Sequence, residues 1–201
     1  MSDKKFLSEV YDLATPAETR ALYDDWSASY DAEITENGYA TPRRIAEALA
    51  QFADPSAPVL DFGCGTGLSG LALKAAGFQT IDGADLSADM LKGAAEKGAY
   101  RKLWQVEAGD PIPDGYTAIT ATGVIGIGAA PAETFDTILA ALAPGGHFAL
   151  RLNDHALADP QFEARLTESI DASKAKLLFR EYGTHLPGID LKSTVYVLEK
   201  T

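Results

Sequence analysis

The glycine-rich stretch VLDFGCGTGLSG, residues 59–70, constrains this chain more than any other part of its sequence, because it carries two patterns at once. Read from Asp61, it is an acid followed by alternating glycines, D-x-G-x-G-x-G. Read from Gly65, it is G-x-G-x-x-G, which ends at Gly70. Both patterns are typical of the turn that joins the first strand of a parallel sheet to its first helix, where a nucleotide-containing cofactor binds. The stretch therefore predicts an α/β fold and leaves two types of cofactor open.

Strands and helices alternate from this stretch onward. Apolar runs predict strands at 57–62, 79–84, 102–107, 116–122 and 146–152, and apolar periodicity predicts helices at 67–76, 88–97 and 132–143. Ser87 is placed to cap the second of these helices, and Gly77 and Gly98 follow the first two as C-terminal caps do. This alternation indicates a parallel sheet with helices on both faces.

The end of the chain predicts a different arrangement. A helix at 160–173 precedes two strand-like runs, KLLFREY and STVYVLE, which THLPGIDLK connects. Two neighbouring runs of this kind indicate an antiparallel hairpin at the edge of the sheet. The expected fold is therefore a doubly wound, Rossmann-like, seven-stranded and mostly parallel sheet with an antiparallel C-terminal hairpin and a helical N-terminal extension.

The chain is expected to form a single domain, 1–201, made of a helical extension (1–55) and an α/β core (56–201). Thr15-Pro16-Ala17-Glu18 has the cap, the proline and the capping-box acid of a helix start. Further residues at helical spacing are Tyr23, Trp26 and Tyr30, then Ile45, Leu49 and Phe52 after a second start at Thr41-Pro42. Their spacing predicts that each set of three lies on one helical face.

Composition excludes several classes of function. The formal net charge of −12 and the scattered basic residues disfavour nucleic acid as a partner. No apolar run approaches the ~20 residues of a membrane span, and the first residues lack the apolar core of a signal peptide, so the cytoplasm is the expected location. Cys64 is the one cysteine, and neither a disulfide within the chain nor a metal is expected. A small molecule is the expected partner, and no feature indicates the oligomeric state.

The length of the glycine loop distinguishes the two patterns. A dinucleotide fingerprint places its first glycine at the strand end, so that the pyrophosphate meets the helix N-terminus. Here a five-residue loop, Gly63 to Gly67, separates strand and helix. Asp61 would repel a pyrophosphate, but it suits the ammonium group of an amino-acid tail, directly or through water. The D-x-G-x-G-x-G reading is favoured, and Gly70 is interpreted as a small residue where the helix meets the sheet.

Three stretches, VLDFGCGTG, GADLSADML and LAPGGHFAL, together resemble the class I S-adenosylmethionine-dependent methyltransferases. With YDDWSASYD before the glycine loop and KGAYRKLWQVE after the second helix, the chain is similar to the small-molecule-type group that includes the Williams–Beuren region methyltransferase-like proteins. The resemblance extends over most of the chain. It implies S-adenosylmethionine as cofactor, S-adenosylhomocysteine as product, and in-line displacement of the methyl group by a small-molecule acceptor.

The resemblance also implies a role for each matching residue. The methionine part of the cofactor would be surrounded by Asp61, Phe62, Gly63, Cys64, Gly65 and Gly67. Asp85 would bind the ribose hydroxyls, which it could do for either cofactor, and Leu86 and Met90 would flank the adenine. The adenine would also meet the Glu107 carboxylate and the Ala108 N–H. Thr122 and Gly123 would lie beneath the methyl group.

Two interpretations remain open for the aromatic residues Tyr23, Trp26 and Tyr30. They could form an apolar seam that packs the extension onto the core. Alternatively, the extension could be a lid in which Tyr23 and Tyr30 reach the cofactor and a ring closes over the sulfonium. Cys64 is interpreted as a small loop residue, because nothing adjacent would lower its pKa.

The acceptor side offers few polar candidates. The fourth strand ends in TATGVIGIG and lacks the Asn-Pro-Pro-aromatic signature of DNA and glutamine methyltransferases. After the fifth strand, Asn153 and His155 are weak catalytic candidates, His155 as a base near neutral pH. His147 is interpreted as structural. His185, in the hairpin connection, is a lesser candidate.

These features are compatible with three functions. The first is a methyltransferase that acts on a small molecule. The second is a protein that binds S-adenosylmethionine without transferring its methyl group, since the acceptor side has few polar groups. The third is an NAD-dependent oxidoreductase, against which the length of the glycine loop counts.

Overall fold

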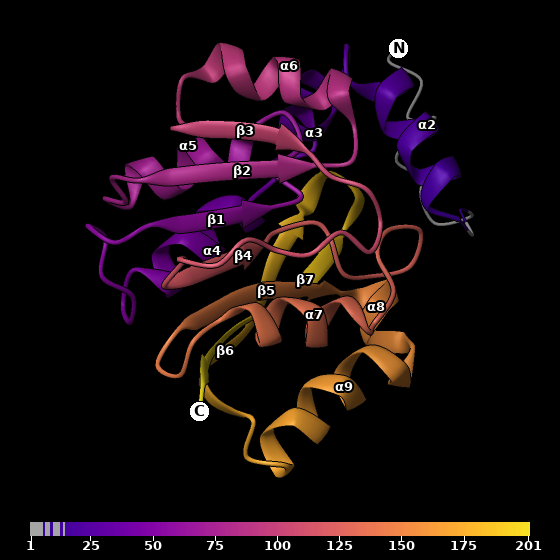
Figure 1. Cartoon of the computed structure of the whole chain (residues 1–201). Coiled ribbons are helices and arrows are strands. Elements are labelled where there is room, and N and C mark those ends of the chain that lie inside the picture. Colours follow the sequence, from indigo (N-terminus) through magenta and orange to yellow (C-terminus); the bar gives the residue numbers. More distant parts are fainter. Residues whose placement is uncertain (1–5, 7–8, 10–12, 14) are drawn as a thin grey trace.

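The computed structural model describes residues 6, 9, 13 and 15–201, so part of the expected extension, including residues 1–5, lies outside the described residues. One seven-stranded sheet has the order β3-β2-β1-β4-β5-β7-β6 (Figure 1). Its strands are β1 (Val59–Phe62), β2 (Ile81–Asp85), β3 (Lys102–Gln105), β4 (Ala118–Ala121), β5 (His147–Asn153), β6 (Ala175–Leu186) and β7 (Leu191–Lys200). Strands β1 to β5 are parallel, and β7 is antiparallel to both of its neighbours. The expected doubly wound, mostly parallel sheet is confirmed.

Helices cover both faces of this sheet because the strands alternate their buried side chains. Val59 packs with α4 (Thr41–Leu49) and α5 (Leu68–Ala75), whereas Leu60 packs on the opposite face with α7 (Thr134–Ala141) and α9 (Pro160–Asp171). Successive residues of a strand point to opposite faces of the sheet. When helices cover both faces, the odd and the even positions of a strand are therefore both apolar. The helix α6 (Ala88–Lys97) packs beside α5, with Ser87 as N-cap and Gly98 as C-cap, as expected.

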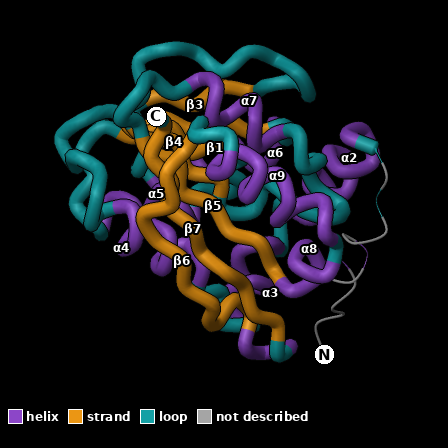
Figure 2. Tube along the Cα trace, turned by 90° about the horizontal axis from the view of Figure 1, so that it is seen from below, coloured by secondary structure: helices purple, strands orange, loops and turns teal. Residues whose placement is uncertain are grey.

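The expected antiparallel C-terminal hairpin is confirmed at the edge of the sheet, but its connection is shorter than predicted. THLPGIDLK was expected to be a connection, but Thr184 to Leu186 extend β6, and only one short 3-10 turn, Pro187–Ile189, separates the two strands. Strand β7 pairs with β5, and β6 is the edge strand (Figure 2). Because β6 extends to Leu186, His185 lies in a strand.

The N-terminal helices also correct two predictions. The capping box at Thr15 is present in α2 (Pro16–Trp26), but that helix ends at Trp26 and α3 (Tyr30–Glu36) begins at Tyr30. The three aromatic residues therefore do not lie on one helix, although their rings still meet: Tyr23 stacks on Trp26 at 5.8 Å, and Trp26 meets Tyr30 edge-on at 4.7 Å between centroids. Trp26 is only 2% exposed, as a packing residue would be.

The helix α4 begins at Thr41, where its start was predicted, but it ends earlier than expected. Thr41 is inside the helix rather than capping it, since Ala40 is the N-cap, and the Thr41 side chain bonds elsewhere. Phe52 lies beyond the last helical residue, Leu49, and is 37% exposed, so it does not share the buried face with Ile45 and Leu49. No helix in the described part of the chain is long and apolar enough to cross a membrane.

Candidate functional site

A cavity of about 390 Å³ lies where the carboxyl ends of β1, β2 and β4 meet the N-terminal helices. The parallel strands all point to the side on which α2 lies (Figure 1). Most of the residues expected to bind a cofactor line this cavity, namely Tyr23, Tyr30, Phe62, Gly63, Cys64, Gly65, Asp85, Leu86, Met90, Glu107, Ala108, Thr122 and Gly123. Asp61 and Gly67 do not line it. The sheet topology thus brings together side chains that are far apart in the sequence.

The alternating glycines of the loop are required by the backbone. Gly63, Gly65 and Gly67 have φ angles of 73°, 53° and 92°, in the left-handed region that side chains disfavour. A Cβ at Gly63 would lie 2.1 Å from Val124 Cγ2, so the loop passes close to the segment after β4. Gly67 is the N-cap of α5 and shapes the loop from outside the cavity. This conformation explains the D-x-G-x-G-x-G spacing.

Asp61 is a structural residue in this arrangement. It is fully buried, and its carboxylate accepts hydrogen bonds from the hydroxyls of Ser69 (2.5 Å), Tyr100 (2.7 Å) and Thr120 (3.0 Å). Burial raises its pKa, and the three hydroxyl donors act against that rise. Asp61 does not line the cavity, so its expected contact with an amino-acid tail, directly or through water, stays a prediction. Its hydroxyl partners occupy it and hold the strand end in place.

Asp85 is the carboxylate that faces the cavity. One oxygen accepts from the Gly65 N–H at 2.7 Å, and the other accepts from the Ser87 N–H at 2.9 Å. A carboxylate has about four lone-pair sites, so both oxygens keep capacity to accept from a ligand hydroxyl. Burial raises the pKa of Asp85 to about 6. The same residue thus fixes the glycine loop and offers an acceptor to the cavity.

Glu107 lies in a loop, because β3 ends at Gln105 instead of reaching residue 107. Its side chain is 63% exposed and forms an ion pair with Arg20 of α2. The backbone N–H of Glu107 donates to Asp110 at 2.8 Å. Glu107 therefore faces the rim of the cavity, with one carboxylate oxygen already engaged by the N-terminal helix.

Polar contacts join the two N-terminal helices to the segments that form the cavity. Besides the Arg20–Glu107 pair, Asp24 of α2 accepts a hydrogen bond from the Ser87 hydroxyl. Asp31 of α3 accepts from the Thr66 hydroxyl and, at 2.6 Å, from Lys97 Nζ. The helices cover the cavity through contacts to the glycine loop, to α6 and to the loop after β3.

A second, smaller cavity of about 60 Å³ adjoins the first. The two share five lining residues, Tyr23, Tyr30, Tyr39, Gly123 and Ala129. Arg151, Asn153 and His185 line only the smaller one. Sequence reasoning missed Arg151 and Tyr39. Arg151 could have been noticed as a charged residue near the end of a buried strand, whereas nothing in the sequence places Tyr39 beside it.

Of the two histidines considered as acceptor-side candidates, His185 lines a cavity and His155 does not. His155 is exposed on α8 (Asp154–Ala158) and lines neither cavity, so the structure does not support it as a base. The reason is that β5 ends at Asn153 and α8 turns His155 outward. Asn153 lines the small cavity, although its side-chain oxygen accepts from the Ala156 N–H at 3.0 Å and caps α8. His185 is 3% exposed and lines the small cavity.

Electrostatics keeps the small cavity's ionisable groups in one state. Burial, together with Arg151 and Arg44, lowers the pKa of His185 to about 2, so its ring is neutral. Burial raises the pKa of the Tyr30 hydroxyl well above its ordinary value, so that group stays protonated. In the part of the chain that the structure describes, no group of three His, Cys, Asp or Glu residues is placed to hold a metal ion.

Comparison of the sequence with known proteins identifies a methyltransferase family. A family model described as a methyltransferase domain matches residues 35–194. Methyltransferase-like protein 27 from Homo sapiens is 31% identical over 158 residues, which cover 75% of this chain and 63% of that protein. The chain therefore spans less than two thirds of that relative's length.

Solved structures show the same fold. The 1,6-didemethyltoxoflavin-N1-methyltransferase of Burkholderia thailandensis, with bound 1,6-didemethyltoxoflavin and S-adenosylhomocysteine, superposes with a TM-score of 0.67 at 21% identity, over 94% of this chain and 92% of that one. A S-adenosylmethionine-dependent methyltransferase from Thiobacillus denitrificans, in complex with S-adenosylhomocysteine, has a TM-score of 0.57 at 14% identity, over 79% and 91%. Both were crystallised with the product of the same cofactor.

Proposed function

Because this chain belongs to the methyltransferase domain family, we propose that it transfers a methyl group from S-adenosylmethionine to a small-molecule acceptor. The observation that carries the small-molecule part is the pair of adjoining cavities that share Gly123 and three tyrosines. The larger cavity would hold the cofactor and the smaller one the reacting part of the acceptor. A volume of about 60 Å³ has room for a few water-sized groups.

The large cavity fits the proposed cofactor in the chemistry of its walls. Asp85 offers carboxylate oxygens suited to ribose hydroxyls, and Leu86 and Met90 provide an apolar surface suited to adenine. Ala108 lies beside them, and Thr122 and Gly123 would lie beneath the methyl group. When bound, the cofactor supplies a methyl group on a positively charged sulfur.

The protein's own contribution would be alignment and exclusion of water. Tyr23 and Tyr30 line both cavities and belong to helices that are tied to the glycine loop and to α6. We propose that these helices, within residues 1–55, act as the lid over the core formed by residues 56–201. Trp26 supplies the packed seam and the tyrosines face the ligands, so the two interpretations of these aromatic residues are compatible.

Charge and size both support a small acceptor. The net charge of −12 disfavours a nucleic-acid acceptor. The ligand named with the Burkholderia thailandensis enzyme is also a small molecule, and that enzyme has the same fold. Asn153 lines the small cavity from the end of β5, next to the shared Gly123.

Calorimetric titration with S-adenosylmethionine, S-adenosylhomocysteine and NAD in parallel tests the cofactor. We expect micromolar binding of both sulfur compounds and none of NAD, with at least a tenfold loss in Asp85→Ala. Asp171→Ala, at an exposed site on α9, is the matched control and should bind as the unmodified protein does. Binding of NAD alone would overturn the proposal.

Turnover tests the acceptor class. The protein is incubated with labelled S-adenosylmethionine and either a small-metabolite fraction or a protein fraction of a cell extract. The proposal expects label to enter the small-metabolite fraction. Label entering only the protein fraction would contradict it, and tight cofactor binding without any transfer would favour a binding protein.

A further inference from the structure

The small cavity contains a guanidinium group that no carboxylate neutralises within the described part of the chain. Arg151 Nε donates to the Thr122 carbonyl at 3.0 Å, which aims its two Nη atoms past the end of β4. A Cβ at Gly123 would lie 3.8 Å from Nη2, and one at Gly126 would lie 3.9 Å from Nη1. The two glycines thus leave room in front of the cation. A half-buried cation without a carboxylate partner favours an anionic ligand, because pairing offsets its loss of water.

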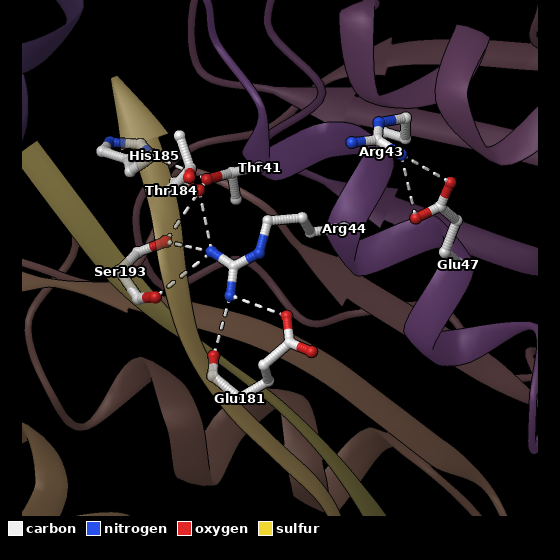
Figure 3. A network of polar contacts seen from close by, with 8 residues as sticks. All are labelled: Thr41, Arg43, Arg44, Glu47, Glu181, Thr184, His185 and Ser193. Atoms are coloured by element: carbon white, nitrogen blue, oxygen red, sulfur yellow. Dashed lines mark hydrogen bonds and ion pairs between the residues drawn. The ribbon is translucent and has the colours of Figure 1, made fainter. Parts of the chain in front are cut away.

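A chain of hydrogen bonds begins at Arg44 and ends at His185 (Figure 3). Arg44 Nη1 donates to the Ser193 hydroxyl oxygen at 3.2 Å, and a guanidinium has no acceptor to offer in return. The Ser193 oxygen lies 3.4 Å from Thr41 Oγ1, which lies 2.7 Å from His185 Nδ1. All of these side chains lie between α4 and the C-terminal hairpin.

Each hydroxyl in this row of hydrogen bonds finds an acceptor for its hydrogen in only one of the two possible directions of donation. If Thr41 donated to Ser193, the Ser193 hydrogen would have no acceptor among the described residues. With Ser193 donating to Thr41 and Thr41 donating to Nδ1 of His185, every hydroxyl hydrogen is used. Nδ1 is then an acceptor, so the proton of the neutral ring lies on Nε2. That nitrogen has no protein partner in the described residues, and its ring lines the cavity.

Besides the hydroxyls of its tyrosine walls, the cavity therefore presents the Arg151 guanidinium and Nε2–H of His185 as donors, and no carboxylate of a described residue lines it. The ring of His185 packs edge-on against Tyr39 at 5.4 Å between centroids, and Tyr30 forms another wall. Its low pKa makes His185 a poor general base. Neither Arg151 nor His185 lines the larger cavity, which separates them from the place of the cofactor.

We propose that the acceptor carries a carboxylate group, which pairs with Arg151 and accepts a hydrogen bond from Nε2–H of His185. Arg44, Ser193 and Thr41 are positioning residues that set the tautomer of that histidine. This inference rests on the proposed function, because it assigns the small cavity to the acceptor. Aromatic walls beside the two donors suit an acid attached to a flat ring.

The test compares acids with amides of the same shape. The full chain, saturated with S-adenosylhomocysteine, is titrated with benzoate and benzamide, and with phenylacetate and phenylacetamide, by ligand-observed NMR. We expect each acid to bind at least tenfold more tightly than its amide. Arg151→Met should abolish this difference and change the affinity for S-adenosylhomocysteine by less than twofold. Arg43→Met, at an exposed site on α4, is the control.

The outcomes separate this inference from the proposed function. If the unmodified protein does not bind S-adenosylhomocysteine, the proposed function fails and this inference fails with it. If it binds S-adenosylhomocysteine but shows no preference for acids, only this inference is overturned. A tenfold loss of S-adenosylhomocysteine affinity in Arg151→Met would also overturn it, because Arg151 would then serve the cofactor's own carboxylate.

Two further variants test the inference without removing Arg151, in case Arg151→Met does not fold. Gly123→Ala keeps Arg151 but places a methyl group 3.8 Å from Nη2 and 3.6 Å from Tyr39 Oη, so it should weaken acid binding without strain. Thr41→Val removes the donor to Nδ1. Nitrogen-15 NMR of the imidazole should show the Nε2–H tautomer in the unmodified protein and a mixture in this variant, with His185→Gln identifying the signal. A proton on Nδ1 in the unmodified protein would contradict the assignment.

Discussion

Tyr100 places its hydroxyl 2.7 Å from Asp61 Oδ2 and its ring in the space that a side chain at Gly70 would occupy. The same hydroxyl accepts a hydrogen bond from the Gly70 N–H at 3.0 Å. Tyr100 therefore contacts both ends of the glycine-rich stretch, Asp61 through its hydroxyl and Gly70 through its hydroxyl and its ring. Gly70 is small because the ring of Tyr100 lies against α5, and no phosphate is needed to account for the third glycine of G-x-G-x-x-G.

Gly70→Ala should destabilise the protein. Its Cβ would lie 2.3 Å from Cζ and 2.4 Å from Oη of Tyr100, a ring held between α5 and β2. Overpacking of this kind costs about 1–3 kcal/mol, which outweighs the gain of up to about 1 kcal/mol from replacing a helical glycine. Urea unfolding followed by circular dichroism measures the change.

Gly93→Ala is the matched control for this substitution. Gly93 also lies inside a helix, but its Cβ would meet Thr66 at an ordinary contact distance of 3.4 Å. We expect this variant to be as stable as the unmodified protein or up to about 1 kcal/mol more stable. Equal losses in both variants would mean that Tyr100 does not set the size limit at Gly70.

Cofactor affinity should fall as the pH decreases below about 6. Burial raises the pKa of Asp85 to about 6, and hydroxyl donors on a ligand favour the ionised carboxylate. Below that pKa the free protein must lose a proton before it binds, so affinity drops by up to about tenfold per pH unit. Calorimetric titration with S-adenosylhomocysteine from pH 5 to 8 measures this dependence of affinity on pH. Asp85→Asn should bind more weakly with a flat profile, and a sloping profile in that variant would assign the titration to another group.

Acid should destabilise the fold through His185. Its pKa is lowered to about 2 in the folded state, whereas an exposed histidine has a pKa of about 6.5. Only the unfolded chain binds a proton at this site between those values, so stability is lost as the pH falls below about 6.5. The slope is at most about 1.4 kcal/mol per pH unit. His185→Gln should reduce the slope measured by urea unfolding between pH 4.5 and 7. An unchanged slope would show that the histidine is not held neutral.

Cys64 should be unreactive in the folded protein although it lies in the glycine loop. Burial, with the nearby charges of Asp61 and Asp85, raises the pKa of its thiol well above the ordinary value. The thiolate is the reactive form, so modification by Ellman's reagent at pH 8 should be at least about 100-fold slower than in urea. Fast labelling of the folded chain would mean that the loop opens readily.

The N-terminal helices show where sequence reasoning stops short. The capping box at Thr15 was readable from the sequence, because a cap involves neighbours in the chain. The break between α2 and α3 was not, since it follows from packing of Trp26 in a pocket shared with Leu186 and Leu191 of the C-terminal hairpin. Those partners lie far along the sequence.

The sequence by itself determined the alternating sheet, the glycine loop, and a set of expected cofactor residues most of which line the large cavity. These depend on period, turn chemistry and the rule that parallel strands end at one edge. Tertiary structure alone decided that Asp61 is buried among three hydroxyls, that His155 turns outward, and that Arg151 and His185 meet at a second cavity. The physical reason is that burial and polar contacts arise between elements far apart in the sequence, and no local pattern shows which distant side chains will pack together.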